Sequence, residues 1–576
     1  MKRILGLALV AACASTPPRY PLREPMWRDT DLDSARVACR PDPDPDKPGH
    51  RLCRPVEYES SFAWDGFDNM VTRPFTKWFA VDVNGEAVNV NSFDETPDSA
   101  WFTNRIGRAP MTPEEVARGP CDEPPLPVDG PDGSWVIDLG KMNGANPGFR
   151  VRLPDGRRYM LKADEPGEAE RATGATAIAT RLYWSAGWWV PCDSVVYVRP
   201  SIFSLRPGLT VTDNTGMTRP FELSALHKLL EGANHRGELV RMSASRWLTG
   251  RALGPFRYEG TKDDDPNDII PHEHRRDLRG ARVIASWLNH FDAREQNSMN
   301  IWLADDPKDS DSSPGLVRHY YLDLGDCFGS QWDWDEMSRR LGYAYYFDFG
   351  YFFADWFTFG VIRRPWDRAV RTQEGWIFGY FSDDFDPDAW RAGYPNPAFN
   401  HAAEHDNAWG ARILARFTDE AVAKSIEVGQ YTDPRHVAYL NRTLRARRDI
   451  ILRRYFSVLS PVADLRVDGN EVCGVDLARR TKVFPDTQFR YGAGAFAGAR
   501  RAALPAGPVV RTGDAGEVCV VLPRIAGDGG APPDDASRYL VVSLVNGQGS
   551  GPLMMHLYDL GPAKGYKLVG LERQKP

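Results

Sequence analysis

Residues 289–325 read NHFDAREQNSMNIWLADDPKDSDSSPGLVRHYYLDLG. The residues before this stretch place apolar side chains at helical spacing, so a helix is expected to end just ahead of it. Asp292 comes first and Asn297 follows five residues later. Two predicted strands separated by a polar loop come next, at residues 301–303 and 316–322. Because a hairpin folds its second strand back on the first, we expect Asp323 to lie beside Asn297.

A second group of polar residues lies more than a hundred residues upstream. Lys162 falls within the last of three short predicted strands, at residues 135–138, 149–153 and 159–163. A helix is predicted over residues 168–186, with Gly187 ending it. Glu170 heads the apolar side of that helix, so we expect its carboxylate to meet the Lys162 ammonium. Gly144 and Gly148 lie in the polar loop between the first two strands and suggest contact with phosphate, although the loop is not a GxGxxG motif.

Phosphoryl transfer requires side chains of these kinds in this order. A lysine held by a carboxylate contacts the nucleotide phosphates, and a second carboxylate orients the attacking hydroxyl. An asparagine and a third carboxylate then hold Mg²⁺ or Mn²⁺ on the phosphates. No single one of these residues is informative, because Asp and Asn are common in loops. The whole set in kinase order predicts an α+β, two-lobed protein-kinase-like domain.

The motifs DAREQN (292–297) and YLDLG (321–325) resemble the catalytic and metal loops of HipA-type, CotH-type and phosphatidylinositol-kinase-like kinases. The resemblance implies that Asp292 is the catalytic aspartate and that Asn297 and Asp323 are metal ligands. It also implies that Lys162 binds the phosphates of ATP or another nucleotide and that Glu170 is its partner. Departures include His290 in the catalytic loop and Leu324 after Asp323, and a shifted loop would make Asn300 the ligand in place of Asn297.

Three further segments resemble a group of exported bacterial proteins that have no clear assigned activity. They are NSFDETPDSAWFTNR (91–105), AERATGATAIATRLYW (169–184) and HEHRRDLRG (272–280). This resemblance brings no substrate with it.

The first residues predict export. Lys2 and Arg3 precede a short apolar run, residues 4–10, that is too short to span a bilayer. The following Ala-Ala-Cys resembles a lipobox, which implies a signal peptide over residues 1–12 and a lipid on Cys13. The alternative is a simple secretory signal cleaved nearby. Both readings export the protein, and the lipobox reading anchors it in a membrane of the cell envelope, with the outer membrane expected.

The other seven cysteines agree with an oxidising compartment. Cys39–Cys53 and Cys473–Cys519 are expected disulfides, Cys121–Cys192 is a weaker third, and Cys327 is left over. Sequence alone does not establish these pairings. No CxxC or other metal spacing occurs, and the net charge of -7 gives no reason to expect a nucleic-acid partner.

Six regions are predicted along the chain. They are a signal peptide (1–12), a tether (13–60), an N-terminal extension (61–130), a kinase-like N-lobe (131–260), a helical C-lobe (261–460) and a C-terminal β domain (461–576). Residues 343–362 are aromatic and apolar over nearly the length of a membrane span, but they contain two aspartates, so a buried core helix is the better interpretation.

Three functions compete. The motifs favour a phosphotransferase that uses a nucleotide and Mg²⁺ to modify a protein or small-molecule hydroxyl in the envelope. Scarcity of ATP outside the cytoplasm favours a non-catalytic binding or scaffold protein with the same fold. The HxxEH spacing of His401, Glu404 and His405 is typical of inverted zinc peptidases, because a helix would place both histidines on one face. Nothing in the sequence singles out a third zinc ligand.

Overall fold

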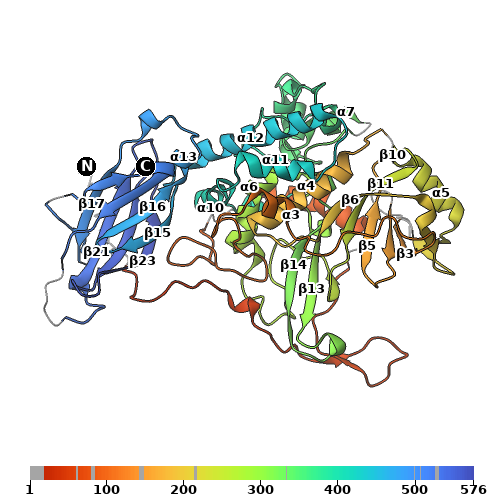
Figure 1. The fold of residues 1–576 in the computed structure, drawn as a ribbon, viewed down its shortest axis with the longest axis horizontal. Helices are drawn as coiled ribbons and strands as arrows, with labels where there is room; N and C mark the ends of the chain where they lie inside the picture. The colour runs from red at the N-terminus through yellow and green to blue at the C-terminus, as the bar shows by residue number, and fades with distance from the viewer. Residues whose placement is uncertain are drawn as a thin grey trace, which may run out of the picture. The chain divides into compact units, whose positions relative to one another are not determined.

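The computed structural model describes residues 19–59, 62–79, 85–141, 148–165, 167–212, 217–331, 334–498, 500–505, 507–525 and 531–576. The chain divides into two compact units (Figure 1). The larger unit contains the described residues of 26–91 and 95–456, and the smaller contains those of 19–25, 92–94 and 457–576. The signal peptide and Cys13 lie outside the described residues.

A seven-stranded, mostly antiparallel sheet opens the larger unit. Its order is β10-β11-β5-β4-β3-β7, and β6 also pairs with β11. The strands are β3 (Trp135–Lys141), β4 (Gly148–Arg152), β5 (Arg158–Lys162), β6 (Asp193–Val198), β7 (Phe203–Leu205), β10 (His235–Arg236) and β11 (Leu239–Arg246). The three strands expected around residues 135–163 are therefore confirmed, because their alternating apolar residues share one buried face.

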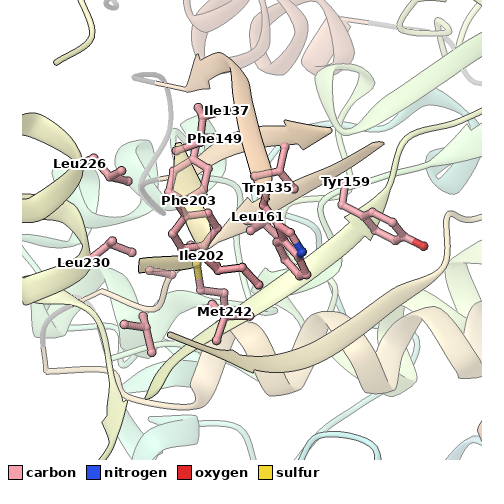
Figure 2. Close-up of a cluster of buried hydrophobic side chains, with 14 of the residues drawn as sticks. Trp135, Ile137, Phe149, Tyr159, Leu161, Ile202, Phe203, Leu226, Leu230 and Met242 are labelled. Atoms are coloured by element: carbon pink, nitrogen blue, oxygen red, sulfur yellow. The ribbon is translucent and has the colours of Figure 1, made fainter. Parts of the chain in front are cut away.

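The buried face of this sheet is filled by aromatic and branched side chains. Figure 2 shows Trp135, Phe149, Leu161 and Phe203 gathered there. Helix α5 (Leu223–Gly232) covers the cluster with Leu226 and Leu230, the two residues of this helix that are buried. This core holds β5 rigid up to Lys162.

Helix α4 (Arg171–Ala186) follows β5 and confirms the predicted helix. Asp164 begins it by accepting hydrogen bonds from the backbone N–H groups of Glu170 and Thr173, at 2.9 and 2.8 Å. Gly187 ends it with φ of 136°, a backbone conformation that side chains other than glycine rarely adopt. The helix is buried along nearly its whole length.

The hairpin predicted between Asn297 and Asp323 is confirmed. Helix α6 (Arg276–Leu288) leads through a short loop into the antiparallel strands β13 (Ser298–Ala304) and β14 (Gly315–Tyr321), which form the long hairpin in Figure 1. β12 (Arg251–Gly254) pairs with the other edge of β13. The remaining α-helices downstream in this unit are α7 (Asp335–Arg340), α8 (Phe349–Thr358), α9 (Pro397–Asn400), α10 (Glu404–Leu414), α11 (Asp419–Glu427) and α12 (Pro434–Phe456).

The prediction of a buried core helix at residues 343–362 is wrong. Helix α8 covers only ten of these residues and has no buried residue. Apolar composition alone predicted burial, but the aromatic side chains of α8 lie on the surface of the larger unit. No helix in the part of the chain that the structure describes is long and apolar enough to cross a membrane.

The segment expected to be a tether is packed in its described part. Asp31 is buried and accepts a hydrogen bond from the Ala100 N–H at 3.1 Å, and its carboxylate lies 3.3 Å from Arg275. Further on, Arg54 pairs with Asp311 at 2.7 Å. High Pro and Asp content predicted an extended linker, but these charges find partners in the larger unit.

The smaller unit contains two antiparallel sheets around one core. One sheet has the order β15-β16-β20-β19 and the other β18-β17-β21-β22-β23. The strands are β15 (Val462–Asp468), β16 (Glu471–Asp476), β17 (Gly492–Ala497), β18 (Ala502–Ala503), β19 (Val510–Thr512), β20 (Glu517–Val521), β21 (Tyr539–Val545), β22 (Leu553–Asp559) and β23 (Tyr566–Arg573). The expectation of C-terminal β structure is confirmed.

The described residues form three disulfides: Cys39–Cys53, Cys121–Cys192 and Cys473–Cys519. They match the three expected pairs, and Cys327 is a buried thiol, also as expected. Disulfides of this number are typical of a protein that folds outside the cytoplasm.

The backbone at Gly187 gives a test of this packing. A Cβ atom there would lie 2.1 Å from Cε2 of Phe102, in addition to the cost of positive φ. We expect Gly187→Ala to lower the free energy of unfolding of the larger unit by about 3 kcal/mol or more, measured by urea denaturation. The matched control is Gly156→Ala, where φ is 87° but no atom lies within 4 Å, and about 1 kcal/mol is expected. Equal losses in the two variants would contradict the close packing of Phe102.

Candidate functional site

An ion pair joins the two halves of the candidate site. The Lys162 Nζ atom lies 2.6 Å from Oδ1 of Asp323, across 161 residues of sequence. Burial disfavours the ammonium charge, but Asp323 outweighs it, so the pKa of Lys162 is raised. The lysine is therefore fully charged at neutral pH and is held at the end of β14.

Glycine lets the strands approach at this point. Gly148 lies directly opposite Lys162 on the neighbouring strand. A Cβ atom at Gly148 would lie 2.3 Å from the backbone oxygen of Leu161 and 3.2 Å from Cγ of Lys162. Gly148 thus shapes the wall beside the lysine, whereas Gly144 lies outside the described residues.

The segment after Asp323 is clamped to helix α4. Asp323 itself has left-handed backbone angles (φ 55°, ψ 52°), which an aspartate tolerates better than most residues. Arg171 donates to the backbone oxygens of Gly325 and Gly329, at 3.0 and 2.9 Å, and pairs with Glu168. Glu168 in turn accepts from the Gln331 N–H at 2.9 Å. These contacts tie the segment to the first turn of α4 and so fix where Asp323 stands.

Within the predicted catalytic loop, the last residue of the motif, Asn297, forms hydrogen bonds back to the first, Asp292. The Asn297 side-chain amide donates to the Asp292 carboxylate at 2.6 Å and to the Asp292 backbone oxygen at 2.9 Å. The Leu322 N–H donates to the Asn297 backbone oxygen at 2.8 Å, which places Asn297 beside the residue that precedes Asp323. The structure therefore brings Lys162, Asp292, Asn297 and Asp323 together.

These residues form part of an acidic cluster. Burial, with Asp326 and Asp323 nearby, raises the pKa of Asp292 to about 8, although Arg294 lies 3.4 Å from its carboxylate. Burial and the charge of Asp323 likewise raise the pKa of Asp326. Three carboxylates so arranged disfavour one another's ionisation, and a bound divalent cation would relieve that repulsion.

The expected pairing of Glu170 with Lys162 is wrong. The Glu170 carboxylate accepts from the Thr432 N–H at 2.9 Å. Glu170 precedes the helix with φ of 70°, so it does not follow the helical spacing from which we inferred its direction. Besides Asp323, the carboxylates that raise the pKa of Lys162 are Asp193 and Asp326.

Sequence reasoning missed four residues of this region. They are Glu168, Arg171, Asp193 and Asp326. Asp326 follows Asp323 by three residues and was visible in the same motif. Glu168 and Arg171 have the three-residue spacing of a pair within one helical turn, but nothing in the sequence indicated what Arg171 would bind. Asp193 comes from a strand whose pairing the sequence does not specify.

Asn300, the alternative metal ligand, is used elsewhere. Its side-chain oxygen lies 2.6 Å from Nδ1 of His319, and its amide group donates to the Pro255 backbone oxygen at 3.3 Å. The loop is thus in the register that makes Asn297 the neighbour of Asp323.

The donor set fits a hard divalent cation. Carboxylate and amide oxygens are the ligands that Mg²⁺ and Mn²⁺ take, and Mg²⁺ commonly uses one or two carboxylates together with substrate phosphates. Among the described residues, the one set of three His, Cys, Asp or Glu side chains with ligand atoms mutually within 4.8 Å is Glu471, Cys473 and Cys519. The sulfurs of Cys473 and Cys519 form a disulfide with each other, so this set is not a metal site.

The zinc-peptidase hypothesis is wrong. His401 caps the C-terminus of α9, and α10 begins only at Glu404, so no single helix presents both histidines. Glu404 forms two hydrogen bonds with Arg454, at 2.9 and 3.0 Å. His405 contacts Glu86 at 3.1 Å. The HxxEH spacing is present in the sequence, but α9 ends before His401 and α10 begins at Glu404. His401 and His405 therefore do not share one helical face.

Comparisons with known proteins add a distant likeness. No family model matches the chain, and no curated protein matches it. A crystal structure of the Golgi casein kinase matches with a TM-score of 0.27 and 9% identity, over 57% of this chain and 73% of that one. The same kinase with Mn/ADP bound matches with a TM-score of 0.26 and 10% identity over the same shares. At TM-scores this low, the function proposed below rests on the side chains alone.

His290 makes the free energy of unfolding depend on pH. It is buried at the start of the catalytic loop, and its Nδ1 atom lies 2.9 Å from the Tyr183 hydroxyl. Burial lowers the pKa of His290 to about 4, although Asp323 opposes the shift. The folded protein therefore holds it neutral, whereas the unfolded chain protonates it below about pH 6.5.

We expect His290 to destabilise the fold as the pH falls. The part of the unfolding free energy that depends on a neutral His290 is complete above about pH 6.5. It is lost progressively between about pH 6.5 and pH 4. Relative to wild type, His290→Gln should remove about 2 kcal/mol of the loss in unfolding free energy between about pH 6.5 and pH 4.5. The control is His227→Gln on the exposed side of α5, which should leave the pH dependence unchanged. Parallel pH profiles of wild type and His290→Gln would contradict the buried neutral histidine.

Proposed function

We propose that this chain is an atypical kinase-like phosphotransferase that uses ATP or another nucleotide with Mg²⁺ or Mn²⁺ and acts in the cell envelope. The observation that carries the proposal is the Lys162–Asp323 ion pair beside the Asn297–Asp292 hydrogen bond. In a phosphotransferase the same four side-chain types bind phosphate, metal and the attacking hydroxyl.

Each residue has a role that its surroundings support. Lys162, charged and held in place, would bind the nucleotide phosphates, and Gly148 lets the neighbouring strand approach it closely. Asn297 and Asp323 would hold the metal, which when bound neutralises charge on the phosphates. Asp292 would orient the acceptor hydroxyl and receive its proton. The hydroxyl oxygen would form a bond to the γ-phosphorus of the nucleotide as the bond from that phosphorus to the nucleoside diphosphate breaks. Arg294, 3.4 Å from Asp292, holds that carboxylate in place.

The two lobes of such a kinase correspond to the sheet with α4 and to the helical region after β12. The acceptor class is a protein or small-molecule hydroxyl. A lipid on Cys13 would attach the protein to the envelope membrane. The three disulfides support the compartment, since they persist in oxidising surroundings.

The same compartment favours a second candidate. Extracytoplasmic ATP is scarce, so the chain can also be a non-catalytic binding or scaffold protein of the same fold. This alternative leaves the crowding of Asp292, Asp323 and Asp326 without a purpose, because a binding module has no need of mutually repelling carboxylates. Catalysis therefore explains the site better.

The catalytic role of Asp292 gives the decisive variant. We expect Asp292→Asn to lower metal-dependent hydrolysis of ATP or GTP, and labelling of envelope extract by the γ-phosphate, by at least about 100-fold. Binding of the nucleotide should change by no more than about twofold, since Asp292 is assigned to the hydroxyl. The matched control is Asp309→Asn in the exposed β13–β14 loop, which should retain full activity.

Two results would contradict the proposal. If the wild-type protein neither hydrolyses a nucleotide nor labels any acceptor, the scaffold function replaces it. If Asp292→Asn retains the wild-type rate, activity comes from another site or another protein.

A further inference from the structure

The larger unit carries a continuous exposed aromatic surface. It is formed by α1 (Phe62–Phe67), α2 (Arg73–Phe79) and α8, and we call it the aromatic surface. Ring contacts join α2 to α8 and continue along α8. Phe75 lies 5.0 Å from Phe79 and 5.7 Å from Phe349, measured between ring centroids. Phe349 and Phe357 both lie 6.4 Å from Phe353 along α8.

The side chains at the end of this surface are almost fully exposed. The exposed fractions are 67% for Trp356, 75% for Phe357 and 93% for Phe359. Val361 and Ile362 continue the exposed apolar run. Single exposed apolar residues are ordinary, but a contiguous group of large ones marks a surface that binds something.

A basic cavity adjoins the aromatic surface. It measures about 570 Å³ and lies beside Tyr351 of α8. Its lining contains four arginines and two aspartates: Arg363, Arg364, Arg368, Arg447, Asp384 and Asp386. Arg364 forms an ion pair with Asp355 at 2.9 Å, which leaves three arginines and two aspartates and a small positive charge on the lining.

Arg447, one of these arginines, carries part of the positive charge because no carboxylate pairs with it among the described residues. Its guanidinium donates instead to the backbone oxygens of Trp287, Ser382 and Ser286, at 3.0, 2.7 and 2.5 Å. Burial lowers the pKa of Arg447 to about 9, which leaves it charged at neutral pH. An anion that entered the cavity would meet this uncompensated charge.

We propose that the aromatic surface docks on an anionic phospholipid bilayer. Phenylalanine and tryptophan rings enter the interfacial layer of a membrane, and arginines at their margin meet lipid phosphates. The aromatic surface and the basic cavity supply these two features side by side. Charge complementarity selects a phospholipid over an uncharged apolar partner, which would leave the arginines unsatisfied. This contact is separate from any lipid on Cys13.

Docking also bears on the acceptor, and this part rests on the proposed function. Arg73 of α2 pairs with Glu295 of the catalytic loop at 2.9 Å. The aromatic surface is thus attached to the loop that contains Asp292, three residues from Glu295. The acceptor class that fits this arrangement is a hydroxyl at the membrane surface, on a lipid headgroup or on a membrane-bound protein.

Co-sedimentation with vesicles tests the docking surface. The full chain carries Cys13→Ser throughout, so that lipidation does not contribute. Vesicles of phosphatidylethanolamine and phosphatidylglycerol are compared with vesicles of phosphatidylcholine. We expect binding to the anionic vesicles, weakened by salt, and a loss of about tenfold in apparent affinity for Phe357→Ser/Phe359→Ser. The control Leu223→Ser/Ile269→Ser changes two exposed residues outside the aromatic surface and should bind as the parent does.

A second pair of variants tests the basic margin. Arg363→Glu/Arg368→Glu should abolish the preference for anionic over phosphatidylcholine vesicles. Unfolding curves confirm that each variant is folded, which exposed positions permit. The proposal is overturned if the parent binds neither vesicle, or if the aromatic and control pairs lose affinity equally. It is also overturned if Phe357→Ser/Phe359→Ser abolishes self-association in sedimentation while vesicle binding is unchanged, because the surface is then an interface between copies. Because none of these readings uses catalysis, they are independent of whether the chain transfers phosphate.

Discussion

The contact between Lys162 and Asp323 is the constraint on which the candidate site depends. It joins the end of β5, an inner strand of the seven-stranded sheet, to the end of the β13–β14 hairpin. The pair is only partly buried, with 35% of the Asp323 side chain exposed, so the attraction between its charges adds little to stability. Its persistence is therefore better explained by what the two groups do together than by stability. Phosphate and metal would each take one member of the pair as a ligand.

Helix α4 transmits the same constraint to the backbone. Arg171 holds the oxygens of Gly325 and Gly329, so the position of Asp323 depends on the first turn of α4. Gly325 permits this approach, since a Cβ atom there would lie 3.0 Å from Oγ1 of Thr176. At its other end the helix stops at Gly187, packed against Phe102. Helix α4 thus contacts both the sheet and the segment that follows the hairpin, and it fixes the position of one relative to the other.

Local patterns predicted most of the elements that carry the site. Strand alternation located β5 with Lys162, and the order of Asp292, Asn297 and Asp323 around a hairpin predicted the neighbours that the structure shows. Glu170 was misplaced because a left-handed residue before a helix does not follow the helical spacing. The apolar composition of residues 343–362 predicts a core helix, but hydropathy reports composition and not which neighbours cover a side chain, so it misplaces α8. Asp193 and Arg171 required tertiary pairing that no local pattern contains.

The central claim is that Asp323 is both the partner of Lys162 and a ligand for a nucleotide-bound metal. Its most direct test is a thermal-shift titration of the wild-type protein and Asp323→Ala with ADP and ATP, each with and without Mn²⁺. A ligand at about 100 times its dissociation constant stabilises the folded state by about 2.7 kcal/mol. The account predicts a shift in the wild type that needs the metal and is absent from Asp323→Ala. A wild type that responds to no nucleotide, or an Asp323→Ala variant that responds equally, would contradict it.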